Sequence, residues 1–145
     1  MNLERYTDRA RGQVQAAQTI ALREGHQSFV PEHILKALLD DSEGLAANLM
    51  NAAGGHPKKA LTAVDAELQK LPRVEGGGAG QLYMKPETAR LFTQAEELAD
   101  KAGDKYVTTE RLLLALALSS STPSSTILKD AGITAQGLNL SLIHI

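Results

Sequence analysis

The chain has 145 residues, enough for one domain, and 43% of them are apolar, enough for one hydrophobic core. That core should be aliphatic, because the chain has no Trp and few other aromatic residues. Fifteen basic and seventeen acidic residues leave a formal net charge of -2, which argues against nucleic acid or an anionic membrane as a partner. Cysteine is absent, which excludes disulfides and thiolate metal sites and fits a reducing compartment.

The sequence has no apolar run long enough to span a membrane and no apolar core of a signal peptide, so we expect a cytoplasmic protein. Residues 141–145 are apolar and aperiodic, unlike the rest of the chain. We interpret them as a truncated or non-native tail and leave them out of the expected fold.

An internal repeat dominates the sequence, because residues 7–54 align without a gap with residues 85–132 at a constant offset of 78. Ten of the 48 aligned positions are identical, including Gly25 with Gly103. Each copy alone has only a thin apolar face, so we predict that the two copies share one core. The expected fold is all-α, with two multi-helix copies related by a pseudo-twofold axis and packed as one domain over residues 1–140.

The first helix of each copy is the clearest expected element. Apolar residues recur at helical spacing after Thr7, which can cap the helix, and Gly25 can end it. The counterpart should run from about Pro86 to Ala102 and end at Gly103.

Shorter helices should follow in both copies, and no segment alternates as a strand does. We expect these helices to begin at Pro31, after Thr108, near residues 44 and 123, near Pro57 and after Thr134. Residues 73–81 are rich in glycine and should form a flexible linker between the copies.

Three patterns that could suggest catalysis fail in their details. The glycines between residues 76 and 80 are followed by Gln81 and Leu82, and not by the Lys and Ser or Thr of a phosphate-binding loop. The serine-rich residues 119–125 lack the glycines of a nucleophile elbow and are better explained as a helix-capping loop. Adjacent acidic residues, at 40–41 and 96–97, diverge on a helix. The sequence therefore predicts a chain with no catalytic site and no cofactor of its own.

The histidines offer no metal site, because no two of them are four residues apart on a helix and no other ligands cluster with them. We expect surface or helix-capping roles instead. They are His26, His33, His56 and His144.

Several segments of the chain resemble the amino-terminal repeat of the Clp family: LERYT at residues 3–7, ALREGH at 21–26, VPEHIL at 30–35 and KAGDKYVTTE at 101–110. The doubled unit covers nearly the whole chain, to about residue 138. The segment LPRVEG at residues 71–76 resembles the ClpB branch rather than the ClpA and ClpC branches, which work with proteases.

The resemblance implies a mobile amino-terminal module that captures apolar segments of unfolded or aggregated polypeptides. The whole protein would be a cytoplasmic AAA+ disaggregase, a hexamer that threads these clients through its ring and cooperates with the Hsp70 system. ATP and magnesium would bind ATPase domains outside this chain. The isolated module should be monomeric.

The resemblance also implies that three polar residues, Thr7, Asp104 and Glu110, lie near the client-binding surface. Each has a structural interpretation as well. Thr7 can cap a helix, Asp104 follows a helix-ending glycine, and Glu110 suits the positive first turn of a helix. Function and structure are both open for these residues.

A groove for unfolded chains should be apolar, shallow and tolerant of sequence. Leu91 and Leu98 lie beside the apolar stripe of the helix at 86–102, and Gln13 takes the position of Leu91 in the first copy. We therefore expect Leu91 to be partly exposed and Leu98 to lie at the edge of the groove. A purely structural role of both leucines in the core is an open alternative.

Two other functions are open. An adaptor-docking domain of a ClpA-type or ClpC-type protease unfoldase would bind a folded partner, and the sequence downstream of this chain would distinguish it from a disaggregase. A small hydrolase would need a nucleophile and a base that converge, and the sequence shows no such pair.

Overall fold

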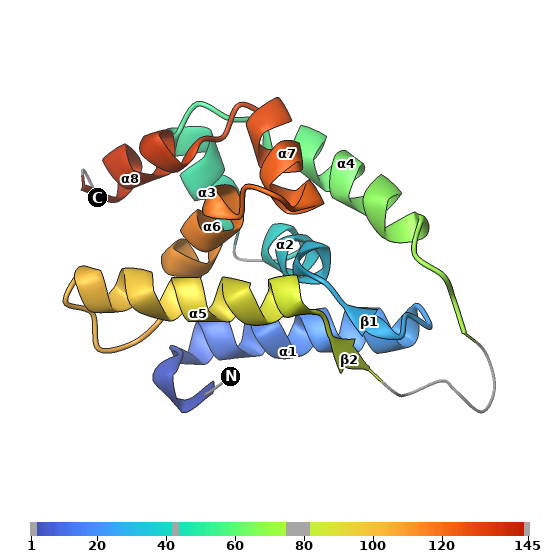
Figure 1. Ribbon diagram of the computed structural model, residues 1–145. Coiled ribbons are helices and arrows are strands. Elements are labelled where there is room, and N and C mark those ends of the chain that lie inside the picture. The colour runs from blue at the N-terminus through green and yellow to red at the C-terminus, as the bar shows by residue number, and fades with distance from the viewer. Residues whose placement is uncertain (1–2, 42–43, 75–81, 144–145) are drawn as a thin grey trace.

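The computed structural model of the chain describes residues 3–41, 44–74 and 82–143, with side chains through residue 139. Within these residues the fold is all-α, as predicted. Figure 1 shows α1 and α5 along one side, α2 and α6 in the middle, and α3, α4, α7 and α8 on the opposite side. The elements are η1 (Leu3–Arg5), α1 (Asp8–Arg23), β1 (Ser28–Phe29), α2 (Pro31–Leu39), α3 (Leu45–Ala52), α4 (Pro57–Gln69), β2 (Tyr83–Met84), α5 (Pro86–Lys101), α6 (Thr109–Leu118), α7 (Pro123–Asp130) and α8 (Ala135–Ile143).

The helices of the second copy repeat those of the first in register. Helices α5, α6, α7 and α8 begin 78 residues after α1, α2, α3 and α4, respectively. This confirms the duplication and extends it, because α4 and α8 lie beyond the repeat limits of 54 and 132. Residues 141–143, set aside above as a tail, belong to α8, and residues 144–145 lie outside the described part.

Local sequence explains where the helices start. The hydroxyl groups of Thr7, Thr108 and Thr122 cap α1, α6 and α7, because each accepts a hydrogen bond from a first-turn amide. The Thr122 cap confirms the expected role of the serine-rich loop. Proline occupies the first position of α2, α4 and α5, and also of α7, which therefore has both a threonine cap and a proline. Both long helices end at a glycine with positive φ, Gly25 and Gly103.

Two short parallel pairings join the copies, and the sequence did not predict them. Strand β1 pairs with β2, with Phe29 opposite Met84, and an isolated bridge joins Tyr6 to Val107. Met84 is the counterpart of Tyr6 in the second copy, and Val107 is the counterpart of Phe29. A single pseudo-twofold rotation therefore exchanges the two pairings. Strands of two residues are too short to show the alternation by which strands are recognised.

One hydrophobic core contains residues of both copies. Most of it is aliphatic, as expected, but aromatic rings occupy the region between the two pairings. The ring of Phe92 lies edge-on to Tyr6 at 6.1 Å and 6.5 Å from Phe29. Three of the few aromatic residues of this chain are therefore packed together at the junction between the two copies.

A buried carboxylate also ties the copies together. Glu32, in the first turn of α2, accepts hydrogen bonds from the Ser124 hydroxyl at 2.6 Å and the Ser124 amide at 3.1 Å. Burial raises the pKa of Glu32, and these hydrogen bonds act against that rise. Glu110 is the counterpart of Glu32 in the second copy, and Ala46 is the counterpart of Ser124 in the first. The two glutamates are therefore identical in the alignment but differ in their surroundings, because alanine cannot replace the serine hydroxyl.

The start of the predicted linker is attached to the first copy. Arg73 pairs with Glu24 at 2.7 Å, and the Val74 amide donates to the Gly25 carbonyl at 2.8 Å. The rest of the predicted linker, with the glycines at 76–80, lies outside the described residues. Among the described residues, no helix has both the length and the apolar character that a membrane crossing requires.

Candidate binding surface

The Tyr6–Val107 bridge gathers three of the predicted site residues. The Thr7 amide donates to the Val107 carbonyl at 3.0 Å, and Asp104 and Glu110 lie three residues to either side of Val107. Tyr106 lies next to the bridge as well. We call Thr7, Asp104, Tyr106 and Glu110 the bridge surface.

The structural interpretations of the polar residues hold. The Thr7 hydroxyl accepts from the Ala10 amide at 3.2 Å and so caps α1. Asp104 accepts from the Arg111 guanidinium at 3.2 Å, which links the turn before the bridge to α6. Glu110 lies in the first turn of α6. All of these side chains are half-buried, so each can also contact a bound polypeptide.

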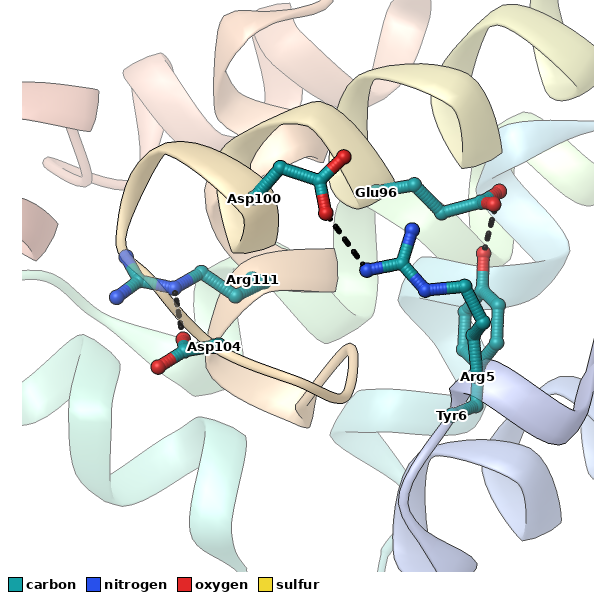
Figure 2. A network of polar contacts seen from close by, with 6 residues as sticks. All are labelled: Arg5, Tyr6, Glu96, Asp100, Asp104 and Arg111. Carbon is teal, nitrogen blue, oxygen red and sulfur yellow. Dashed lines mark hydrogen bonds and ion pairs between the residues drawn. The ribbon is translucent and has the colours of Figure 1, made fainter.

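Charged pairs continue from the bridge onto α5, as Figure 2 shows. Arg5 pairs with Asp100 at 2.8 Å. The buried Tyr6 hydroxyl donates to the Glu96 carboxylate at 3.4 Å. Burial, reinforced by the negative charge of Glu96, raises the pKa of Tyr6, so the hydroxyl remains a hydrogen-bond donor.

Tyr106 is a residue that the sequence reasoning missed. Its side chain is 45% exposed, and the Lys105 ammonium lies 5.7 Å from the centre of its ring. In the sequence, Tyr106 stands out as an aromatic residue in the turn after Gly103, outside the apolar stripe of any predicted helix. An exposed aromatic ring beside ordered polar groups provides an apolar contact for a partner.

The expectation that Leu91 is partly exposed is wrong. Leu91 is 1% exposed and belongs to the core, which is the structural alternative left open above. The argument failed because its counterpart Gln13 is buried too. The Gln13 amide group donates to Asp41 at 2.7 Å and accepts from the Thr109 hydroxyl at 2.6 Å, so its polar atoms are satisfied inside the protein.

Leu98 lies half-buried on α5 and packs against the core. It is four residues after Gln94, so it shares one edge of α5 with that residue, and Glu96 lies on the other edge. Its place at the edge of a groove stays a prediction.

Two histidines contradict the expected surface positions, because His26 and His33 are buried. Their rings are hydrogen bonded, His26 Nδ1 to His33 Nε2, at 2.8 Å. His33 Nδ1 also accepts from the Val30 amide at 3.1 Å, so this histidine has a capping role as well. Burial lowers the pKa of His33 to about 4 and also lowers that of His26. His56 is exposed at the start of α4, as expected, and His144 lies outside the described residues.

The described residues include no group of three or more His, Cys, Asp or Glu side chains arranged to hold a metal ion. The bridge surface offers an exposed ring and polar groups that are held by ion pairs and caps. Such an arrangement is suited to binding a polypeptide by contact.

Comparison with known proteins supports the resemblance. Residues 5–131 match the family model of the Clp repeat (R) N-terminal domain. The chain is 54% identical over 142 residues to the chaperone protein ClpB of Rhodopseudomonas palustris, covering 98% of this chain and 16% of that protein. It is 37% identical over 142 residues to the chaperone protein ClpB of Porphyromonas gingivalis, with coverage of 98% and 16%. The chain thus spans about one sixth of the length of these curated relatives.

Solved structures share the fold. The N-terminal domain of Hsp104 from Candida albicans superposes with a TM-score of 0.81 at 22% identity, covering 95% of this chain and 89% of that one. The N-terminal domain of ClpD from Arabidopsis thaliana gives a TM-score of 0.69 at 20% identity, with coverage of 99% and 98%. The duplicated helices, the match over residues 5–131 and these neighbours agree, and the chain belongs to the Clp repeat N-terminal domain family.

Proposed function

We propose that this chain is the substrate-binding N-terminal domain of an ATP-dependent ClpB-type chaperone, and that it captures apolar segments of unfolded or aggregated polypeptides. The family match over residues 5–131, together with ClpB relatives that the chain resembles over almost its entire length, carries this proposal. The exposed ring of Tyr106, beside Thr7, Asp104 and Glu110, supports the bridge surface as one contact area. Leu98, half-buried on α5, is a further proposed contact residue.

In this proposal, capture is weak and reversible. A fully buried apolar side chain contributes roughly 1.5–3 kcal/mol before the cost of ordering the client is subtracted. The bridge surface offers one exposed aromatic ring and half-buried polar groups, so it can bury only a few client side chains. Weak binding allows a client to be passed on.

The domain itself would carry no catalysis. The parent protein would be a hexameric cytoplasmic ATPase that threads the captured segment and cooperates with the Hsp70 system. ATP and magnesium would bind in its ATPase domains, outside this chain.

A second candidate is an adaptor-docking domain of a ClpA-type or ClpC-type unfoldase. The ion pairs of Arg5 with Asp100 and of Asp104 with Arg111 favour it, because a fixed pattern of charges suits a folded partner better than a variable client.

A titration of the 145-residue chain followed by amide NMR tests the proposal. The ligand is reduced, carboxymethylated lactalbumin, which stays unfolded, and native lactalbumin is the folded control. We expect shifts at Thr7, Asp104, Tyr106 and Glu110 with the unfolded ligand alone. The variant Tyr106→Ser should weaken binding severalfold, while Leu118→Ser, a change at another exposed apolar residue, should not. An absence of shifts with the unfolded protein would contradict client capture.

A further inference from the structure

The pseudo-twofold relation assigns each residue of the network in Figure 2 a counterpart at the other pairing. The counterparts of Arg5, Tyr6, Glu96, Asp100, Asp104 and Arg111 are, in that order, Tyr83, Met84, Gln18, Leu22, His26 and His33. Every charged member of the network is replaced by a residue that is uncharged at neutral pH. The Asp104–Arg111 ion pair becomes the His26–His33 hydrogen bond. The β1–β2 pairing therefore lies under an apolar surface, where the Tyr6–Val107 bridge has a charged one.

That surface is exposed. Leu22, Tyr83 and Met84 are 41%, 63% and 40% exposed, which places them among the few large apolar side chains that the described residues leave in solvent. Leu22 and Tyr83 take the positions of Asp100 and Arg5, whose side chains touch each other. The twofold thus brings Leu22 and Tyr83 together, and Met84 follows Tyr83 in β2. We call Leu22, Tyr83 and Met84 the apolar surface.

The backbone of β2 adds a hydrogen-bonding edge. The amides of Tyr83 and Lys85 donate to β1, at Gln27 and Phe29, so the amide of Met84 faces the opposite side. At the other bridge the equivalent amide, that of Tyr6, donates to the Leu3 carbonyl in η1. Among the described residues, the Met84 amide has no such acceptor. An open strand edge of this kind accepts an extended chain.

Two basic residues adjoin the apolar surface in the chain. Arg23 follows Leu22 in the chain, and Lys85 follows Met84, and both side chains are exposed. Neither has an ion-pair partner within the described residues. The nearby Glu24 is already paired with Arg73. A segment with a carboxylate next to its apolar residues therefore complements this surface.

We propose that the apolar surface and the open edge of β2 bind an extended apolar segment of a client polypeptide, with an acidic residue of that segment beside Arg23 and Lys85. The inference rests on the proposed capture of unfolded clients and names a second contact area for them. Main-chain pairing tolerates many sequences, which suits a receptor of unfolded chains.

The test uses the 145-residue chain and the blocked peptide Ser-Val-Ser-Leu-Ser-Val-Asp-Asp. We expect amide shifts at Leu22, Tyr83 and Met84. The double variant Leu22→Asp with Tyr83→Arg transfers the charged pair of the other copy to this position, so the fold should hold, and binding should fall at least tenfold. Leu118→Asp is the matched control, since Leu118 is 38% exposed and also lies in the last turn of a helix. Its effect should stay within twofold.

The peptide itself can be varied. Replacing its two Asp residues by Lys should weaken binding several-fold, and N-methylation of its central amides should abolish it. Thermal unfolding of each variant checks the fold independently. Equal affinities of the double variant and the unchanged chain would overturn the inference.

Two further outcomes would also overturn it. If unfolded lactalbumin shifts only the amides of the bridge surface, client capture stands and the apolar surface has no part in it. If sedimentation shows a dimer of the unchanged chain that the double variant dissociates, the occupant is a second copy.

Discussion

The two pairings that join the copies have the same backbone and opposite chemistry. At the Tyr6–Val107 bridge, ion pairs and a tyrosine–carboxylate hydrogen bond connect η1, α5 and α6. At the β1–β2 pairing, the same positions hold a buried histidine pair and exposed apolar side chains. After a duplication, the backbone register persists because the shared core depends on it. The residues around each pairing are free to diverge, so one fold provides two different surfaces.

The largest expected loss of stability is at Leu91, the buried counterpart of Gln13. Leu91→Ala should lower the free energy of unfolding by about 2–5 kcal/mol, because it leaves a cavity in the shared core. Leu118→Ala, at an exposed position, should change it by no more than about 0.5 kcal/mol. Urea unfolding measures both. Equal, small effects would mean that Leu91 is at least partly exposed, as we expected from the sequence.

The buried histidine pair predicts a pH dependence of stability. Burial lowers the pKa of His33 to about 4, below its usual value, so the unfolded chain binds more protons between about pH 6.5 and pH 4. Stability contributed by neutral His33 is therefore present above about pH 6.5 and is lost as the pH falls towards 4. One pKa unit corresponds to ~1.4 kcal/mol, so the loss should approach ~3 kcal/mol.

The matched variant is His33→Gln, because glutamine at this position of a helix can still accept from the Val30 amide. The difference in unfolding free energy between the two chains, measured at several pH values, removes the contribution of other groups. A difference that does not change between pH 6.5 and pH 4 would contradict the buried neutral pair.

The glutamates Glu32 and Glu110 offer a smaller contrast. Ser124→Ala removes one hydrogen bond to the buried Glu32 carboxylate and should cost about 1–3 kcal/mol. Glu110→Gln, at the half-buried counterpart, should change stability by about 0.5 kcal/mol or less. Thermal and chemical unfolding of both variants provide the comparison. Similar costs would show that the two glutamates share one role.

The smallest effect belongs to the exposed ion pair of Arg5 with Asp100. Asp100→Asn should reduce stability by ~0.2–1 kcal/mol at low salt, and added salt should reduce the difference further. A loss well above this range, unchanged by salt, would indicate that the pair is a structural support of the bridge.

Much of the fold could be predicted from the sequence, because duplication leaves a signal that a single copy does not. Capping threonines, initial prolines and terminal glycines marked the helix ends to within a few residues. The two pairings could not be predicted, since two-residue strands have no period. Leu91 and the histidines were misplaced because polarity was taken as a sign of exposure, whereas Gln13 and His33 satisfy their polar atoms inside the protein and His26 is buried against His33. Tyr106 was missed because it lies in a turn.

The most direct test of the account is the amide NMR map of the chain with unfolded lactalbumin, recorded at low and at high salt. The account predicts shifts at both pairings, at Thr7, Asp104 and Tyr106 and at Leu22 and Met84. High salt should weaken the shifts at Leu22 and Met84, because an acidic client residue lies beside Arg23 and Lys85 in this account. Shifts at neither pairing would contradict the account.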